Sequence, residues 1–283
     1  MPKLEITNDL IFKIVFGSDT PESAIARHGL LEAMIKKEIR DVKLINPELL
    51  PLYPKDKDVF SDMVVTFNDG ETSSVEMQVR HLPGDNKRFT YSLSRLHSTQ
   101  KLRKEDYTQI KSAYLLLFTC YDVKKSDEYY HQVTYRFEDG SIYDDTPQIL
   151  IGEIGKMKDV ILTKEDIKDL RDDEALLYFL KHCSNEEKRD KIEMIKEGRG
   201  FISMAQKLYN GISEERHEEL RKLSIEMAKE RMKAEAYYEG FAEGKLEMMV
   251  TLLPSLLEKM PLEEAALLLK IPVEKAKELI EME

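Results

Sequence analysis

The stretch of sequence that decides the fold is residues 62–78, which read DMVVTFNDGETSSVEMQ. Two runs rich in strand-forming residues flank an Asn-Asp-Gly turn at 68–70. This pattern predicts a β-hairpin with a three-residue loop of type I geometry, closed by a glycine in the left-handed conformation. With that loop, counting outward places Asp62 directly opposite Glu76. A two-residue loop would instead send these carboxylates to opposite faces, because a strand's side chains alternate with a period of two.

The predicted register gathers polar side chains on one face of the hairpin. Residues directly opposite each other share a face, with Cβ atoms roughly 4.5–5.5 Å apart. The same alternation puts Gln78 on the face of Asp62 and Glu76. Two carboxylates held this close call for a cation or a shared proton between them. The other interpretation is a solvent-facing polar stripe on an ordinary hairpin, and the hairpin alone leaves both open.

Composition describes a soluble globular protein without a membrane segment. The 283 residues suffice for one large domain or two ordinary ones, and hydrophobic residues make up 42% of them. The N-terminus has no apolar signal core, and the longest apolar run, around 114–121, is far too short to span a bilayer. Cys120 and Cys183 lack the spacing of a disulfide framework or a zinc site. We therefore expect a cytoplasmic protein.

The charge is unevenly distributed along the chain. A formal net charge of −11 argues against a general nucleic-acid binder, but residues 79–125 hold ten basic and four acidic side chains. This net charge of +6 directly follows the hairpin, where it could hold a phosphate backbone beside an acidic pocket. A solvated helix face is the alternative interpretation. The candidate DNA-binding residues are Arg80, Lys87, Arg88 and Arg95.

The pattern of apolar residues changes near residue 160, where strand signals give way to a helical pattern. We expect a first domain at 1–160 and a helical region at 161–283. The predicted helices of the first domain lie at 9–16, 21–37 and 87–103, and its predicted strands lie at 42–46, 59–67, 72–79, 112–123, 129–137 and 148–154.

The helical region is expected to mediate contacts with other chains. Two Glu-Gly pairs stand four residues apart at 239–240 and 243–244, and Pro261 and Pro272 suit the first turns of two short helices. A helix-turn-helix is the competing interpretation, but residues 261–283 carry six acidic and three basic side chains. An acidic segment suits a major groove poorly, so we expect a homo-oligomer assembled through these helices.

Several motifs in order carry a family resemblance. They are DLIFKIVFG at 9–17, Asp62 with EMQ at 76–78, a helix with Arg88, Tyr91 and Gln100, KEDY at 104–107, GEIGK at 152–156 and MPLEE at 260–264. This order resembles the recombination-promoting nuclease, or transposase-like, branch of the PD-(D/E)XK nuclease superfamily. One departure is KEDY, where the family often has Gly-Glu-x-Tyr.

The resemblance implies a restriction-endonuclease-like α+β fold, in which a mixed β-sheet is flanked by helices. It also implies that Asp62 and Glu76 ligate a metal, Mg²⁺ or alternatively Mn²⁺, and the main-chain carbonyl of Met77 can add a ligand. Gln78 stands where the superfamily usually has lysine, as is common in this branch. Asp9 matches an acidic position of the first helix.

The function implied is a Mg²⁺-dependent DNA endonuclease that acts in recombination, mobile-element biology or defence. Because Gln78 carries no charge, Lys13, Arg80 and Arg88 are candidates to supply the missing positive charge. His81 and His97 are assigned no role. The alternatives are a catalytically weak relative that binds DNA, and a helical oligomerisation protein that no longer acts on nucleic acid.

Overall fold

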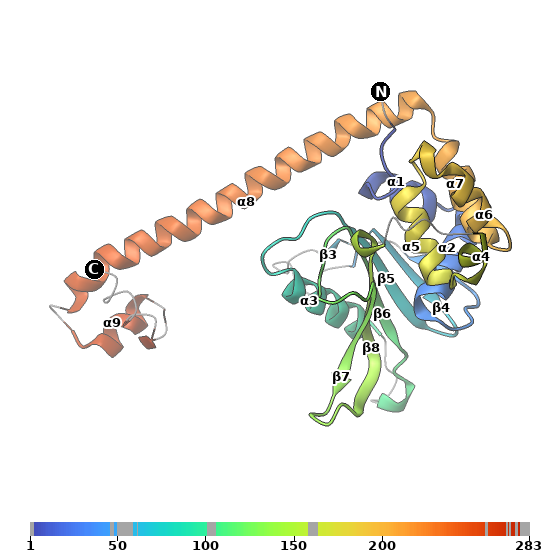
Figure 1. Cartoon of the computed structure of the whole chain (residues 1–283). Coiled ribbons are helices and arrows are strands. Elements are labelled where there is room, and N and C mark those ends of the chain that lie inside the picture. The colour runs from blue at the N-terminus through green and yellow to red at the C-terminus, as the bar shows by residue number, and fades with distance from the viewer. Residues whose placement is uncertain are drawn as a thin grey trace. The chain divides into compact units, whose positions relative to one another are not determined.

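The computed structural model describes residues 3–45, 48–49, 59–60, 62–100, 106–157, 164–257, 260–269, 271, 273–274 and 277. The chain separates into two compact units, Met1–Leu220 and Arg221–Glu283, and each is described by itself. The first unit contains the sheet and the helices that pack on it (Figure 1). In the described part of the chain, every helix is too short or too polar to cross a lipid bilayer.

A mixed sheet forms the centre of the first unit. Among the described residues it has six strands in the order β1-β4-β5-β6-β8-β7, and a separate small sheet pairs β2 with β3. The neighbours β5-β6 and β6-β8 run parallel and the other neighbours run antiparallel. The strands are β1 Lys43–Ile45, β2 Glu48–Leu49, β3 Val59–Phe60, β4 Met63–Phe67, β5 Glu71–Gln78, β6 Ala113–Thr119, β7 Tyr130–Arg136 and β8 Ile142–Glu153.

Helices cover both faces of this sheet (Figure 1). On one face α3 (Asp85–Ser98) packs its apolar side over β5, β6 and β8. The other face carries the larger core, which α1, α2, α5 and α7 share. The other helices are α1 Asp9–Phe16, α2 Pro21–Ile35, α4 Lys164–Asp169, α5 Asp172–His182, α6 Arg189–Lys196, α7 Gly200–Asn210, α8 Glu214–Leu257 and α9 Leu262–Leu269, with 3₁₀ turns at Tyr107–Gln109, Ile154–Lys156 and Glu186–Lys188. This arrangement confirms the predicted α+β, restriction-endonuclease-like class.

The first helix forms where its local sequence predicts it. The side chain of Asn8 caps α1 by accepting hydrogen bonds from the backbone N–H groups of Leu10 and Ile11. The apolar side of the helix is fully buried, and the helix ends at Phe16 before Gly17, as predicted. α2 ends at Ile35, two residues before the predicted end, because Lys36 takes the left-handed conformation.

The hairpin has the predicted loop length and register but a different turn geometry. Phe67 pairs with Glu71 across the three-residue loop, which confirms the register. Type I geometry was the wrong prediction, since Asn68 and Asp69 have φ values of 44° and 60°. The side chain of Asn68 accepts a hydrogen bond from Arg40 N at 2.7 Å and donates one to the Glu38 carbonyl at 3.1 Å. These bonds hold the turn against the neighbouring loop, and Asn and Asp tolerate positive φ better than most residues.

Several predicted boundaries differ from the structure. β6 ends at Thr119, four residues before the predicted end. The arm expected at 59–67 is divided, because Val59–Phe60 pairs with β2 and only Met63–Phe67 joins β5. β8 begins at Ile142, earlier than the expected start at residue 148. The helix expected at 87–103 spans Asp85–Ser98, and residues 101–105 lie outside the described part of the chain.

Two hydrogen bonds hold the chain just after α3. The amide of Gln100 donates to the Lys111 carbonyl at 2.7 Å and accepts from the Lys111 N–H at 2.8 Å. This pair of bonds ties Gln100 to the residues that lead into β6. Gln100, which the resemblance assigns to the helix, is therefore bound to the backbone of Lys111.

The change of pattern near residue 160 marks the end of the sheet, whereas the compact unit extends to Leu220. Helices α5 and α7 are part of the first unit because their side chains share the core of α1 and α2. The fully buried side chains there include Tyr178, Phe179, Ile202 and Tyr209. The division expected at residue 160 therefore coincides with the last strand and not with a gap between packed units.

The second unit has a small core of its own. Met249 and Leu253 of α8 pack with Ala265 and Ala266 of α9. α9 begins directly after Pro261, whose carbonyl accepts the first helical hydrogen bond from Ala265 N at 3.0 Å. The second short helix, expected from Pro272, falls largely outside the described residues.

Candidate active site

The hairpin carries its polar residues on the face of the sheet that α3 covers. Met63 pairs with Val75, and one further step in the same register places Asp62 opposite Glu76. Glu76 also pairs with Leu117 of β6, whose side chain belongs to the core beneath α3. The predicted hairpin register is therefore confirmed and the two-residue loop is excluded, while Asp62, which directly precedes β4, acts electrostatically on Glu76.

Asp62 is held from two directions. Its Oδ2 accepts a hydrogen bond from the backbone N–H of Met77 at 2.8 Å, and its Oδ1 lies 3.3 Å from Lys13 Nζ. Burial raises the pKa of the Asp62 carboxyl, and the nearby charge of Asp9 adds to the rise. The Met77 bond and Lys13 oppose it. Asp62 is thus a fixed carboxylate beside a cation.

Helix α1 brings two of the predicted residues to this point. Asp9 is the first residue of the helix, and Lys13 follows one turn later on the same side. Both act electrostatically on Asp62. Since Asp9 and Asp62 are separated by 53 positions in the chain, their approach depends on the packing of α1 at the end of β4.

Glu76 is a deeply buried carboxylate. It is only 3% exposed, and burial raises its pKa to about 7. Arg88 and Gln78 lower this pKa, whereas the charges of Asp62 and Asp85 raise it. Its Oε2 accepts a hydrogen bond from Gln78 Nε2 at 3.2 Å, but its buried Oε1 has no hydrogen-bond partner among the described residues. A buried carboxylate oxygen in this state is costly unless a cation or proton joins it.

Gln78 connects Glu76 to α3. Its Oε1 accepts a hydrogen bond from Arg88 Nη2 at 2.9 Å. The same nitrogen of Arg88 donates to Asp85 Oδ1 at 3.0 Å, and Tyr121 OH donates to Asp85 Oδ2 at 3.0 Å. The sequence analysis missed Asp85 and Tyr121. The three-residue spacing of Asp85 and Arg88 was a possible signal for an ion pair, but nothing in the sequence links Tyr121 to them.

The donor set fits a hard divalent cation. Asp62 and Glu76 offer carboxylate oxygens, which Mg²⁺ and Mn²⁺ prefer. The N–H of Met77 points toward Asp62. In a β-strand the N–H and C=O groups of the same residue point toward the same neighbouring strand, so the carbonyl of Met77 also points toward the Asp62 side. Among the described residues no group of three or more His, Cys, Asp and Glu side chains is suited to a metal ion. Any metal here would thus depend on two carboxylates, a carbonyl and water or substrate oxygens.

The predicted DNA-binding residues differ in their solvent exposure. Arg80 and Lys87 are exposed, and Arg88 is partly exposed beside Gln78. Arg95 is 6% exposed. Arg95 is therefore not available to a DNA backbone. His81 packs edge-on against Tyr121, and the His97 ring lies 3.4 Å from the Thr146 hydroxyl, so both have structural contacts.

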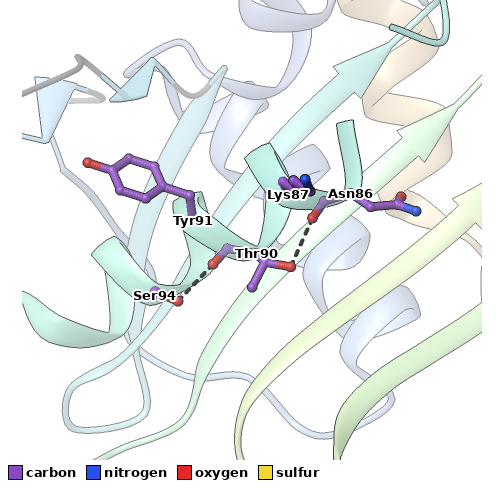
Figure 2. Close-up of a pocket in the computed structure, with 5 residues that line it drawn as sticks. All are labelled: Asn86, Lys87, Thr90, Tyr91 and Ser94. Atoms are coloured by element: carbon purple, nitrogen blue, oxygen red, sulfur yellow. Dashed lines mark hydrogen bonds between the residues drawn. The ribbon is translucent and has the colours of Figure 1, made fainter. Parts of the chain in front are cut away.

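An open pocket runs along the outer side of α3 (Figure 2). Asn86, Lys87, Thr90, Tyr91 and Ser94 line it. The hydroxyls of Thr90 and Ser94 donate to carbonyls one turn earlier in the helix, each at 2.8 Å. The pocket thus presents one cation, an amide and a phenol to solvent, within the same helix that positions Arg88.

Helices on both faces of a mixed sheet, with facing carboxylates on its hairpin, define the class of restriction-endonuclease-like proteins. The sequence matches the family described as PD-(D/E)XK nuclease family transposase over residues 6–237. The match spans well over half of the 283 residues, and the chain belongs to this family. No curated protein and no solved structure was found to match it. Membership indicates a nuclease or transposase-like role, with DNA as the implied substrate.

Proposed function

We propose that the protein is a metal-dependent DNA endonuclease whose active site is built from Asp62, Glu76 and Gln78. One observation carries this proposal: a buried Glu76 oxygen without a described hydrogen-bond partner lies in register with the fixed carboxylate of Asp62. A structural site would have little reason to keep this arrangement, because it lowers stability. The match to a nuclease family supports the same conclusion.

Each residue has a role in the proposed reaction. Asp62, Glu76 and the Met77 carbonyl would hold Mg²⁺ or Mn²⁺, which lowers the pKa of bound water and offsets charge on the phosphate. Gln78 can orient the attacking water through its amide. Lys13 opposes the effect of burial on the pKa of Asp62 and is positioned to donate to a phosphate oxygen, and Asp9 lies on the same side of α1.

The exposed cations beside this site would hold the DNA backbone. Lys87 belongs to the outer pocket of α3, and Arg80 follows the end of β5. Both are exposed, and both lie within a few residues of Gln78 or Arg88 in the chain. Phosphate contacts position a duplex without reading its sequence. Since DNA is the proposed substrate, we expect the protein to act in the cytoplasm, in recombination, mobile-element biology or defence.

A plasmid cleavage assay tests the proposal. Purified full-length protein is incubated with supercoiled DNA and Mg²⁺, Mn²⁺, Ca²⁺ or EDTA, alongside Asp62→Asn and Glu76→Gln. We expect cleavage with Mg²⁺ or Mn²⁺, none with EDTA, and loss in both variants. The matched control is Asp41→Asn, since Asp41 is exposed and its φ of 52° suits asparagine.

Two outcomes would contradict the proposal in different ways. Cleavage that persists in Asp62→Asn and Glu76→Gln would show that the site is elsewhere. Wild-type protein that binds DNA in a salt-dependent manner but never cleaves it would favour the catalytically weak, DNA-binding relative.

We also propose that the C-terminal helices mediate self-association. In the described part of α8, Leu223, Ile225 and Met227 are exposed, and α9 exposes Leu267 and Leu268. Leu223 and Met227 stand four residues apart and share one side of α8, and neighbouring exposed apolar side chains are typical of a contact between chains. Light scattering of the full chain should give a mass that is a multiple of 33.0 kDa. A monomer at all concentrations would contradict this part of the proposal.

A further inference from the structure

We propose that Arg88 supplies the positive charge that Gln78 lacks, and that Asp85 and Tyr121 are positioning residues that hold Arg88 at the active site. This inference rests on the proposed nuclease function, because it assigns roles within the same site. It extends that function to residues on α3 and on the loop after β6, which lie outside the hairpin.

The first step is the contact between Arg88 and Gln78. Arg88 Nη2 is 2.9 Å from Gln78 Oε1, and Gln78 Nε2 is 3.2 Å from Glu76 Oε2. Gln78 therefore joins the guanidinium to the buried carboxylate with its two amide atoms. The Arg88 side chain is 41% exposed, so its other donors can reach a phosphate oxygen. A guanidinium suits that task, because its planar donors match phosphate oxygens.

The second step is the burial of Asp85. Asp85 is 2% exposed, yet its carboxylate accepts hydrogen bonds from three directions. The donors are Leu82 N at 2.9 Å, Tyr121 OH at 3.0 Å and Arg88 Nη2 at 3.0 Å. An exposed ion pair three residues apart on a helix would contribute little by itself. A buried carboxylate with donors from three segments instead fixes the direction of the Arg88 side chain.

The third step is the support of Tyr121. The hydroxyl of Thr119 donates to the Tyr121 carbonyl at 2.8 Å, which fixes the start of the loop after β6. Farther along, the N–H groups of Val123 and Lys124 both donate to Glu153 Oε1 at 2.9 Å. The loop is thus tied to the ends of two parallel strands. Such a support holds a site in one geometry more firmly than a free loop would.

The resulting site has a cation on each side of the carboxylate pair. Lys13 lies beside Asp62, and Arg88 lies beside Gln78 and acts on Glu76. In the usual superfamily pattern a lysine at position 78 would carry this second charge. Here α3 delivers it through Arg88, and Gln78 is the link.

A double-mutant cycle tests the proposal. Steady-state cleavage is measured for wild type, Arg88→Ala, Tyr121→Phe and the double variant, with Tyr143→Phe as the matched control because Tyr143 is 71% exposed. We expect Arg88→Ala to lower kcat by about 10²-fold. Tyr121→Phe should lower kcat by about 10-fold in the wild type and less than about 2-fold in the Arg88→Ala background. Arg88→Lys should recover part of the loss.

A second measurement separates positioning from damage to the fold. The calorimetric Mn²⁺ affinity of Tyr121→Phe should match the wild type, and its circular dichroism spectrum should show a folded protein at the assay temperature. Additive losses of kcat in the cycle, or weaker Mn²⁺ binding by Tyr121→Phe, would overturn the inference about Arg88. The proposed nuclease function would still hold in that case if the wild type cleaves DNA. A wild type without metal-dependent cleavage would overturn both.

Discussion

Two buried glutamates near the ends of strands in the same sheet have opposite surroundings. Glu76 in β5 and Glu153 in β8 are 3% and 0% exposed. Glu153 accepts two backbone hydrogen bonds from Val123 and Lys124, forms an ion pair with Lys156 and lies 3.4 Å from His131 Nε2. Glu76 has one amide donor and an oxygen without a described hydrogen-bond partner.

The difference separates a structural carboxylate from a candidate catalytic one. Two backbone donors to Oε1 and the ion pair of Oε2 with Lys156 compensate for the burial of Glu153, so its charge contributes to the fold. The burial of Glu76 is compensated only in part, which leaves binding capacity for a cation. A buried acidic residue thus indicates function when its partners are too few, and burial by itself does not.

The largest expected effect tests this contrast through activity. Glu76→Gln should lower kcat by about 10³-fold, equivalent to about 4 kcal/mol of transition-state stabilisation. Glu153→Gln should retain most of the activity at a temperature where it is folded. Initial rates on supercoiled plasmid with Mg²⁺ measure both variants. Equal losses in the two variants would remove the distinction between the sites.

The second effect tests the contrast through stability. Glu153→Gln should lower the free energy of unfolding by about 3 kcal/mol, because it leaves the Lys156 ammonium buried without its counter-ion. Urea denaturation followed by circular dichroism measures the change. Glu193→Gln is the matched control, since Glu193 is half exposed and pairs with Lys196 at 2.7 Å. That variant should change stability by less than about 1 kcal/mol.

The third effect is an increase in the free energy of unfolding, opposite in sign to that of Glu153→Gln, and it depends on pH. Burial raises the pKa of Glu76 from 4.5 to about 7. Within this window the folded protein keeps a proton that the unfolded chain releases, so the free energy of unfolding falls as pH rises. In EDTA, Glu76→Gln should therefore raise the free energy of unfolding by about 2 kcal/mol near pH 8 and change it little near pH 5. A difference independent of pH would contradict burial as the cause.

The smallest effect concerns the surface beside Glu76. Lys87→Ala should weaken DNA binding uniformly across sequences and reduce the slope of log K against log salt by about 1. Fluorescence anisotropy in Ca²⁺ over a range of salt concentrations measures it. Lys207→Ala on α7 is the control, because Lys207 is exposed and forms only a long contact of 3.9 Å with Glu22. An equal change of the salt slope in both variants would show that Lys87 of α3 is not a specific part of the DNA-binding surface.

Local features of the fold followed from the sequence, whereas contacts between distant segments did not. The bounds of α1 were predicted because Asn8 caps it and Gly17 follows it. The turn conformation was missed because it depends on bonds from Asn68 to residues 38 and 40. The burial of Arg95 was missed because a helical pattern does not show which residues will cover a side chain in the folded protein.

For the candidate site, the residue types and the register could be predicted, but their partners could not. A loop of three residues pairs Phe67 with Glu71 and Met63 with Val75, and the same register continued by one step brings Asp62 opposite Glu76. By contrast, Tyr121 and Asp85 are 36 positions apart, and only the packing of α3 against β6 brings them together. Lys13 reaches Asp62 in the same way, through the packing of α1.

The sequence by itself determined the hairpin, its register and the order of motifs that the family shares, because these depend on short-range alternation, turn length and capping. The tertiary structure decided which buried carboxylate is satisfied, which arginine meets solvent and which cations stand beside Asp62 and Glu76. The physical reason is that hydrogen-bond satisfaction and burial depend on what each side chain meets across the fold, and strand and helix periodicity specify only the face on which it lies.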